Sequence, residues 1–407
     1  MNRFFTTALV LIFAASVFAG ISSAADPVED KAISMKPSPF RAPAKNRDYW
    51  PTRAWRVKTP AQLGMSAEGL KKVEEYAFTR TGPESERKGI RTDGLVIIKN
   101  GYLVYEKYAG GYDRDRVHLT WSDAKSFVNA LFGIAVKEGK LKVSDPAYRY
   151  YKSLDRGDHR KITIDHLLRM SSGLYANETY EASPLKSTVN AMLFTTGRRD
   201  MAEYAASQDL EAAPGTYWEY SSPCPNLLMA MLKNTMSQKE YDSYPWTRLF
   251  NKIGMKKVVW ERDAAGTFVG SSYLYARPRD MAKFGYLFLN DGMWEGKRIL
   301  PKGWVSYSTT IAPAYYRTEL SERRMTQGTY GAFWWLNQPI PEKGKGKAFP
   351  DAPDDTFAAQ GHWGQFIYVI PSLDLVVAYT GDNREKVFSE NTLLKLIIGS
   401  IKPEARK

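Results

Sequence analysis

The alternation of apolar and polar positions predicts an antiparallel hairpin near the start of the folded chain. Residues 95–99 and 102–105 are rich in β-branched and aromatic residues, and Asn100-Gly101 separates the two runs. Asn-Gly between such runs is typical of a β-hairpin, because both turn positions need a positive φ angle. Just before this hairpin, Ser66 precedes a helical pattern that extends to about Tyr76.

The middle of the chain has the periodicity of helices. From about residue 120 to 255 apolar residues recur at helical spacing, as in Phe127, Leu131 and Ile134. One predicted helix begins at Ser122 and ends near Gly139, and another extends from Asn226. This part is therefore expected to be helical.

Strand-type runs return towards the C-terminus. Residues 330–336 predict a strand, and residues 366–370 and 375–379 predict a second hairpin around a turn that contains Pro371. Apolar positions from Val387 to Ile401 then predict an amphipathic helix. Strands at both ends with helices between them predict an α+β fold, with a sheet subdomain at 61–118 and 271–402 and a helical subdomain at 119–270.

The N-terminus has the pattern of an export signal. Arg3, the apolar run 4–21 and the small residues 22–25 predict a signal peptide at residues 1–24. The alternative is a retained anchor, since the run approaches the ~20 residues that span a bilayer. We expect an exported protein, periplasmic or secreted, that contacts a membrane only through this segment if it is uncleaved. Residues 25–60, rich in Pro, Lys and Arg, predict an extended arm.

Composition excludes several classes of protein. The 407 residues are 43% hydrophobic and 25% charged, as in soluble globular proteins, which excludes a disordered or polytopic membrane chain. The net charge of +13 favours anionic surroundings, although a solvated basic surface explains it more simply and no nucleic-acid partner is expected. One Cys excludes an internal disulfide, and four His without a His-Glu-x-x-His motif argue against a metal site.

A Ser-x-x-Lys pattern is the main candidate for chemistry, and it occurs three times. Ser85 lies in a charged stretch, and Ser183 precedes a proline without an apolar helix behind it. Ser122 instead opens the long apolar helix, where Lys125 lies one turn away from it. The positive end of a helix also favours a developing oxyanion. This context predicts a serine nucleophile; the alternative is a helix-capping Ser122 and a surface Lys125.

A serine nucleophile needs a base, and a desolvated lysine or a neighbouring tyrosine can provide it. Tyr220, in the aromatic turn 214–222, offers a phenol, although a half-buried packing role is the simpler interpretation. His166 and Cys224 are both expected to be structural, the first in a local hydrogen bond or helix contact and the second as a small buried residue.

Three ordered motifs resemble a known family. Ser122-x-x-Lys125, Tyr220-Ser221-Ser222 and 361–364 (Gly-His-Trp-Gly) resemble the three boxes of serine β-lactamase-like hydrolases. The likeness is to the branch of class C β-lactamases, D,D-peptidases and carboxylesterases, especially proteins like 6-aminohexanoate-dimer hydrolase. It extends to residues 164–174 and 279–285 and so covers most of 60–400. The resemblance implies a β-lactamase/transpeptidase-like fold.

The resemblance also implies roles for single residues. Ser122 would be acylated, Lys125 and Tyr220 would transfer protons, and the backbone N–H groups of Ser122 and Gln365 would form the oxyanion hole. The residues expected to bind substrate are His362, Gly364, Ser222, Trp121 and Trp363. His362 stands where many relatives have the lysine of Lys-Thr-Gly, and Ser222 stands where the third box member is often Asn. Both departures resemble the esterase and amidase branches.

The sequence therefore predicts an exported serine hydrolase that forms an acyl-enzyme on Ser122 and cleaves a small carboxylic ester or amide without a cofactor or metal. One alternative is an inactive module that binds a cell-envelope ligand, since a fold does not fix an activity. Another is a penicillin-recognising D,D-peptidase or β-lactamase.

Overall fold

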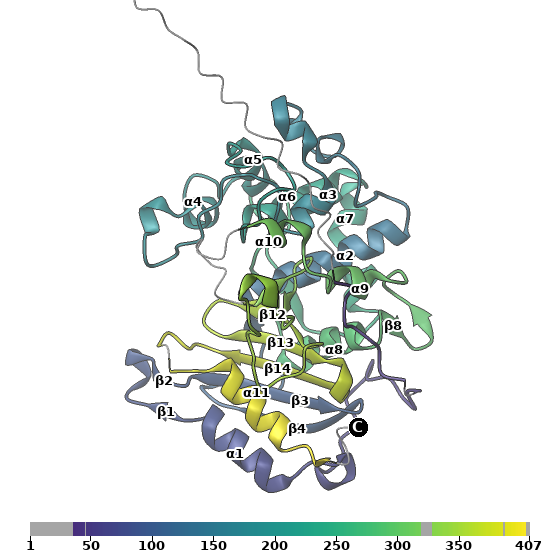
Figure 1. Ribbon diagram of the computed structural model, residues 1–407, viewed down its shortest axis with the longest axis vertical. Helices are drawn as coiled ribbons and strands as arrows, with labels where there is room; N and C mark the ends of the chain where they lie inside the picture. The colour runs from purple at the N-terminus through teal and green to yellow at the C-terminus, as the bar shows by residue number, and fades with distance from the viewer. Residues whose placement is uncertain (1–35, 45, 319–327, 386, 404–407) are drawn as a thin grey trace, which may run out of the picture. The chain divides into compact units, whose positions relative to one another are not determined.

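A computed structural model of the chain describes residues 36–44, 46–318, 328–385 and 387–403 (Figure 1). The predicted signal peptide at residues 1–24 lies outside these ranges. Within them, no helix combines the length and the apolar character that a membrane crossing requires.

A seven-stranded antiparallel sheet joins the two ends of the described chain. The strands run in the order β10-β11-β12-β13-β14-β3-β4. Their bounds are β10 Thr329–Tyr330, β11 Trp335–Leu336, β12 Phe357–Gly361, β13 Gln365–Ile370, β14 Leu375–Gly381, β3 Thr92–Lys99 and β4 Tyr102–Tyr108. The early and late strands meet where β14 pairs with β3, for example at Val377 and Ile97.

Both predicted hairpins are confirmed. Strands β3 and β4 are joined by Asn100 and Gly101, whose φ angles are 54° and 83°. Strands β13 and β14 are joined by a turn over Pro371–Leu373, and Asp374 (φ 45°) closes it. Local turn chemistry and alternation are sufficient to determine both.

The prediction of one strand over residues 330–336 is wrong. The chain turns back at Phe333 (φ 57°), so that β10 pairs with β11 as a short hairpin. Side chains of a distant helix satisfy the carbonyl groups of this turn: Ser126 Oγ donates to Phe333 O (2.7 Å) and Asn129 Nδ2 to Ala332 O (2.9 Å). Tertiary contacts override the strand preference of the segment.

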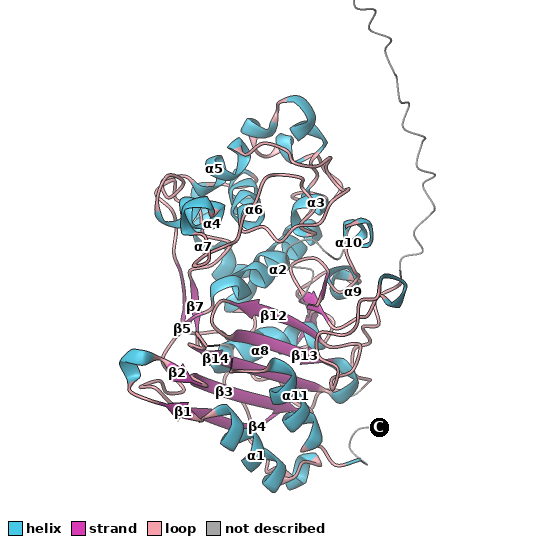
Figure 2. Cartoon of the chain, turned by 60° about the vertical axis from the view of Figure 1, so that its left-hand side comes forward, coloured by secondary structure: helices cyan, strands magenta, loops and turns pink. Residues whose placement is uncertain are grey.

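Helices cover both faces of the sheet (Figure 2). Leu95 and Ile97 of β3 face α1 (Ala67–Ala77) and α11 (Glu390–Gly399), whereas Val96 and Ile98 face α8 (Pro278–Leu289). Helix α1 begins after Ser66, whose Oγ accepts a hydrogen bond from Gly69 N (3.1 Å). The helices predicted at both ends of the folded chain are therefore present.

Residues 124–245, all of them described, contribute helices but no strand to the large sheet. These are α2 Ala124–Lys137, α3 Ile164–Leu168, α4 Thr188–Phe194, α5 Met201–Ser207, α6 Pro223–Asn234 and α7 Gln238–Pro245. This arrangement is the predicted α+β fold, and the subdomain boundaries at 118/119 and 270/271 stay predictions. Helix α6 begins three residues earlier than predicted, with Pro223 at its first position.

Short elements complete the fold. A small sheet has the order β5-β7-β6, with β5 His118–Leu119, β7 Leu274–Ala276 and β6 Val258–Trp260. The others are β1 Arg80–Thr81, β2 Lys88–Gly89, β8 Met293–Trp294, β9 Lys297–Arg298, α9 Trp304–Ser308 and α10 Pro313–Arg317. The described part of the predicted arm is irregular and packs on the fold, where Arg47 Nη1 lies 2.8 Å from Asp374 Oδ2.

Candidate active site

The candidate nucleophile lies in a tight turn between β5 and α2. Residues Trp121–Asp123 form a 3₁₀ turn, and Trp121 has a φ angle of 48°. A positive φ is uncommon for so bulky a residue and costs ~1–3 kcal/mol, which the surrounding structure must offset. The end of β12 lies against this turn, since a Cβ atom at Gly361 would be only 2.2 Å from Thr120 O. Close packing thus fixes Ser122 at the end of the sheet.

Lys125 lies beside the Ser122 hydroxyl. Its Nζ is 2.8 Å from Ser122 Oγ and 3.0 Å from Ser271 O. Lys125 is only 1% exposed, and burial lowers the pKa of its amine to about 8. A lysine with such a pKa is partly neutral near neutral pH and can accept the serine proton. The interpretation of Lys125 as a surface residue is therefore wrong.

The other two Ser-x-x-Lys patterns lack this arrangement. Lys88 and Lys186 are both exposed. Lys88 forms an ion pair with Glu86, and Lys186 ends a short 3₁₀ turn. Burial of its lysine distinguishes the Ser122–Lys125 pair from the two other matches, as the sequence context predicted.

A neighbouring helix holds the carbonyl group that binds Lys125. Asn226 of α6 accepts a hydrogen bond from Ser271 N (2.9 Å) and donates one to Ser271 Oγ (3.1 Å). Ser271 O in turn accepts from Lys125 Nζ. Asn226 therefore positions Lys125 through Ser271, a role that the sequence did not indicate.

Tyr220 lies close to Lys125. Lys125 Nζ is 5.0 Å from the centre of the Tyr220 ring, and that ring stacks on Trp335 at 5.4 Å. Tyr220 is half-buried and lines the same cavity as Ser122. Its ring therefore packs against the protein core while part of the side chain faces the cavity.

A cavity of about 760 Å³ opens above Ser122. Its lining residues are Ser122, Glu178, Thr179, Tyr180, Glu181, Ala182, Tyr220, Trp335, Gln360, Gly361, His362, Trp363, Phe366 and Glu390. Residues of all three predicted boxes thus meet in one cavity. Three carboxylates and no lysine or arginine are among these lining residues, so the cavity wall is acidic.

Of the residues expected to bind substrate, His362 and Trp363 line this cavity. His362 stacks on Tyr180 with ring centres 4.7 Å apart, and its Nε2 lies 2.9 Å from Glu181 Oε1. The polar edge of His362 is therefore occupied by a carboxylate.

Four expected residues have other positions. Ser222 is fully buried, and its Oγ donates to Glu178 Oε2 (3.0 Å), so it holds a lining residue without lining the cavity itself. The Gln365 side chain donates to Gly381 O (2.7 Å) within the sheet. Gln365 and Trp121 line a second cavity, and Gly364 (φ 96°) lies in the β12–β13 turn. The oxyanion role of Gln365 N–H stays a prediction.

Most of the chain matches a known protein family. The model of the Beta-lactamase family matches residues 77–397, a range that contains the nucleophile turn, Tyr220 and the β12–β13 hairpin. The chain belongs to the Beta-lactamase family. It is 22% identical over 308 residues to a 6-aminohexanoate-dimer hydrolase from Paenarthrobacter ureafaciens. The matched region covers 72% of this chain and 75% of that protein. These likenesses support the hydrolase class of the predicted enzyme.

Solved structures show the same fold. A family VIII carboxylesterase has a TM-score of 0.58 at 15% identity and covers 83% of this chain and 98% of its own. A penicillin-binding protein homologue from Pyrococcus abyssi, described as octameric, has a TM-score of 0.58 at 20% identity and covers 82% and 78%. The β-lactamase/transpeptidase-like fold is therefore confirmed.

Several residues that line the cavity were not indicated by any sequence pattern. The segment 178–182 lines one wall of the cavity, although it carries no motif. Glu390, at the start of α11, lines another part and accepts hydrogen bonds from Tyr368 OH (2.8 Å) and Gln360 Nε2 (3.1 Å). Burial raises the pKa of Glu390 to about 7.

Asp123, next to Ser122, is a second buried acid of this β-lactamase-family site. It is fully buried, and neither of its carboxyl oxygens has a hydrogen-bond partner among the described residues. Burial raises the pKa of Asp123 well above its usual range, which favours the neutral acid beside Ser122.

His166 and Cys224 have the structural roles expected of them. His166 Nδ1 accepts a hydrogen bond from Thr163 N (3.3 Å) in a capping box at the start of α3. Cys224 is buried and donates to Ser221 Oγ (3.2 Å), and burial raises the pKa of its thiol. In the part of the chain that the structure describes, no group of three or more His, Cys, Asp or Glu is arranged to hold a metal ion.

Proposed function

We propose that the protein is an exported serine hydrolase that cleaves carboxylic esters or small amides through an acyl-enzyme on Ser122. The observation that carries this proposal is the 2.8 Å contact between Lys125 Nζ and Ser122 Oγ, together with the lowered pKa of Lys125, about 8. A buried amine costs free energy unless it is neutral or paired, so its position beside one serine hydroxyl favours a role as base.

The proposed reaction begins with proton transfer from Ser122 Oγ to neutral Lys125 Nζ. The oxygen attacks the carbonyl carbon of the substrate, and the negative charge on the carbonyl oxygen faces the N–H of Ser122 and a donor from the 361–365 hairpin, for which Gln365 is the predicted residue. Tyr220 passes a proton from Lys125 to the leaving alcohol or amine. Water then gives a proton to Lys125 and attacks the acyl carbonyl carbon. The bond from that carbon to Ser122 Oγ breaks, Lys125 returns the proton to Ser122 Oγ, and the carboxylic acid leaves.

The carboxylates that line the cavity favour substrates without a negative charge. Glu178, Glu181 and Glu390 line it, whereas relatives that bind a carboxylate often use a lysine where this chain has His362. A carboxylate of the substrate would lie near like charges, which is unfavourable. We therefore favour neutral or positively charged esters and amides over penicillins.

The alternative of an inactive ligand-binding module is less well supported. Such a module has no need for a buried lysine with a pKa of about 8 next to a half-buried serine. Export rests on the pattern at residues 1–24 and remains a proposal.

A substrate panel tests the proposal. The purified protein is expected to hydrolyse short-chain p-nitrophenyl esters or small anilides, and the Ser122→Ala variant is expected to lose this activity while it remains folded. Turnover of benzylpenicillin without ester or amide hydrolysis would replace the proposal with the β-lactamase alternative. Ester or amide hydrolysis that survives in Ser122→Ala would show that another residue is the nucleophile.

A further inference from the structure

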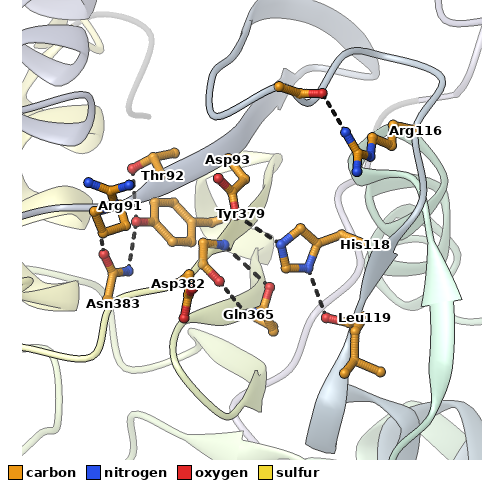
Figure 3. A network of polar contacts seen from close by, with 12 residues as sticks. Arg91, Thr92, Asp93, Arg116, His118, Leu119, Gln365, Tyr379, Asp382 and Asn383 are labelled. Atoms are coloured by element: carbon orange, nitrogen blue, oxygen red, sulfur yellow. Dashed lines mark hydrogen bonds and ion pairs between the residues drawn. The ribbon is translucent and has the colours of Figure 1, made fainter. Parts of the chain in front are cut away.

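A second cavity of about 340 Å³ lies at one end of the large sheet, beyond the wall of the first. It is lined where β3 and β13 begin and where β14 ends, and Trp363 lines both cavities. Figure 3 shows part of its polar network, in which Arg91, Asp93, Arg116 and His118 come from the early strands and loops, and Gln365 and Asp382 from the late ones. Apart from the predicted backbone N–H of Gln365, the proposed reaction steps use no residue of this lining.

The lining of the second cavity has more cations than anions. Five arginines face it, Arg80, Arg87, Arg91, Arg116 and Arg384, against the three carboxylates of Glu84, Asp93 and Asp382. The carboxylates are shared: Glu84 pairs with Arg80 and Arg91, and Asp382 pairs with Arg87 and Arg384. Asp93 pairs with Arg80 and faces His118 Nε2 at 3.0 Å. The arginines therefore lack carboxylate partners of their own.

Arg91 has a buried hydrogen-bond donor without an acceptor. The side chain is 1% exposed, and its ion-pair partner Glu84 is 67% exposed. Arg91 Nε is buried and has no hydrogen-bond partner among the described residues, and the same holds for Arg80 Nε. These two guanidinium groups therefore add positive charge to the cavity wall, and the carboxylates that they share balance it only in part.

Arg116 adds a cation that no carboxylate neutralises within the described chain. Its Nη1 donates a hydrogen bond to Gly111 O (2.8 Å), and its guanidinium stacks on the Tyr112 ring at 4.7 Å. Arg384 lies over the Trp363 ring at 4.0 Å. Arg384 Nε also donates to Asp382 Oδ1 (2.9 Å), so Arg116 is the lining arginine without a carboxylate partner among the described residues. Its planar guanidinium suits a planar or tetrahedral oxyanion.

We propose that this second cavity binds an oxyanion, either the phosphate or the carboxylate group of a small molecule, through Arg116 and the excess positive charge of its lining. The ligand is separate from the substrate carbonyl, because Ser122 lines the other cavity. Forked guanidinium groups match the oxygens of both anions. A comparison of measured affinities for phosphate and for a carboxylate therefore distinguishes the two.

The test is isothermal titration of the purified protein with inorganic phosphate and, separately, with succinate. At least one of them is expected to bind with a 1:1 stoichiometry at low ionic strength. Arg116→Gln is expected to weaken that binding about tenfold, the effect of one lost charge-assisted hydrogen bond. The matched control is Arg114→Gln. Arg114 is an exposed arginine two residues away that does not line the cavity, and its replacement is expected to change the affinity less than about twofold.

A second variant is expected to act in the opposite direction. Glu84→Gln removes the carboxylate that Arg80 and Arg91 share, so the anion should bind about threefold more tightly or better. Absence of binding by both phosphate and succinate would overturn the proposal. An equal loss in Arg116→Gln and Arg114→Gln would also overturn it, because the anions would then bind only to the basic surface. Weaker binding in Glu84→Gln would contradict the assigned charge balance.

Discussion

At the scale of single residues, the proposed reaction depends on the protonation of Lys125. Only the neutral amine can accept the serine proton, and burial lowers its pKa from 10.5 to about 8. The basic form is therefore absent well below pH 8 and predominates above it. We expect kcat/KM to rise with pH, with an apparent pKa of about 8, and then to level off.

The variant Lys125→Arg provides the control for this pH profile. A guanidinium keeps the positive charge but does not lose its proton in this range, so activity should be lost at every pH. A profile that still rises near pH 10.5, or an active Lys125→Arg variant, would contradict the role of Lys125 as base.

Tyr220 is predicted to contribute through its hydroxyl. Tyr220→Phe keeps the ring that stacks on Trp335 and removes only the oxygen. We expect kcat to fall about 10²–10⁴-fold, as for the loss of a general acid–base group. Tyr330→Phe is the matched control, because Tyr330 packs edge-on against Tyr220 but does not line the cavity, and its kcat should change little. Equal effects of the two substitutions, measured by steady-state kinetics, would remove Tyr220 from the mechanism.

At the scale of elements, α6 controls the position of Lys125, the proposed base. Asn226 holds Ser271 by two hydrogen bonds, and Ser271 O accepts from Lys125. Asn226→Ala is expected to lower kcat/KM about tenfold or more, with a displaced pH profile, because Lys125 loses its fixed acceptor. Asn234→Ala changes the same residue type at the other end of α6, where Asn234 Nδ2 donates to Tyr150 O (2.8 Å). This control should leave kcat/KM and the pH profile unchanged. An unaltered pH profile in Asn226→Ala would show a role in stability alone.

The elements also show how far sequence patterns reach. Both hairpins followed from turn residues and alternation, which act over a few neighbouring positions. The turn at Phe333 did not, because its carbonyl groups are satisfied by Ser126 and Asn129 some 200 residues earlier. The segment 178–182 likewise lines the cavity through tertiary packing and has no local signal.

The site was predictable from the sequence only at the motif whose residue types and spacing imply a reaction. The spacing of Ser122 and Lys125 on one helical turn implied their contact, and the structure places Nζ and Oγ 2.8 Å apart. Ser222 was expected to face the substrate, but a buried hydrogen bond to Glu178 directs its side chain elsewhere. Glu178 comes from a loop more than 40 residues away, and no spacing rule links the two positions.

At the scale of the whole molecule, the charge of the cavity opposes the charge of the chain. The net charge is +13, yet three carboxylates line the cavity above Ser122. We expect a cationic ester to be hydrolysed with a kcat/KM about three- to tenfold higher than an anionic ester of the same acyl group at low ionic strength and pH 8.5. Because the pKa of Glu390 is about 7, this preference should decrease as the pH falls through 7 and Glu390 becomes neutral.

Two variants test the origin of that preference. Glu390→Gln should reduce the ratio of the two kcat/KM values at pH 8.5. Glu385→Gln makes the same change at an exposed residue outside the cavity lining and should leave the ratio unchanged. A preference for the anionic ester would show that the net charge of the molecule, rather than the cavity, selects the substrate.

The most direct test of the account is to label the purified protein with a fluorophosphonate, measure its intact mass and map the modified peptide. An activated serine reacts with this reagent whatever its natural substrate, and the contact of Ser122 with Lys125 predicts one such residue. We predict a single adduct on Ser122 that forms faster as the pH rises through about 8 and is absent in Ser122→Ala. A folded protein that remains unlabelled, or an adduct on another serine, would contradict the account.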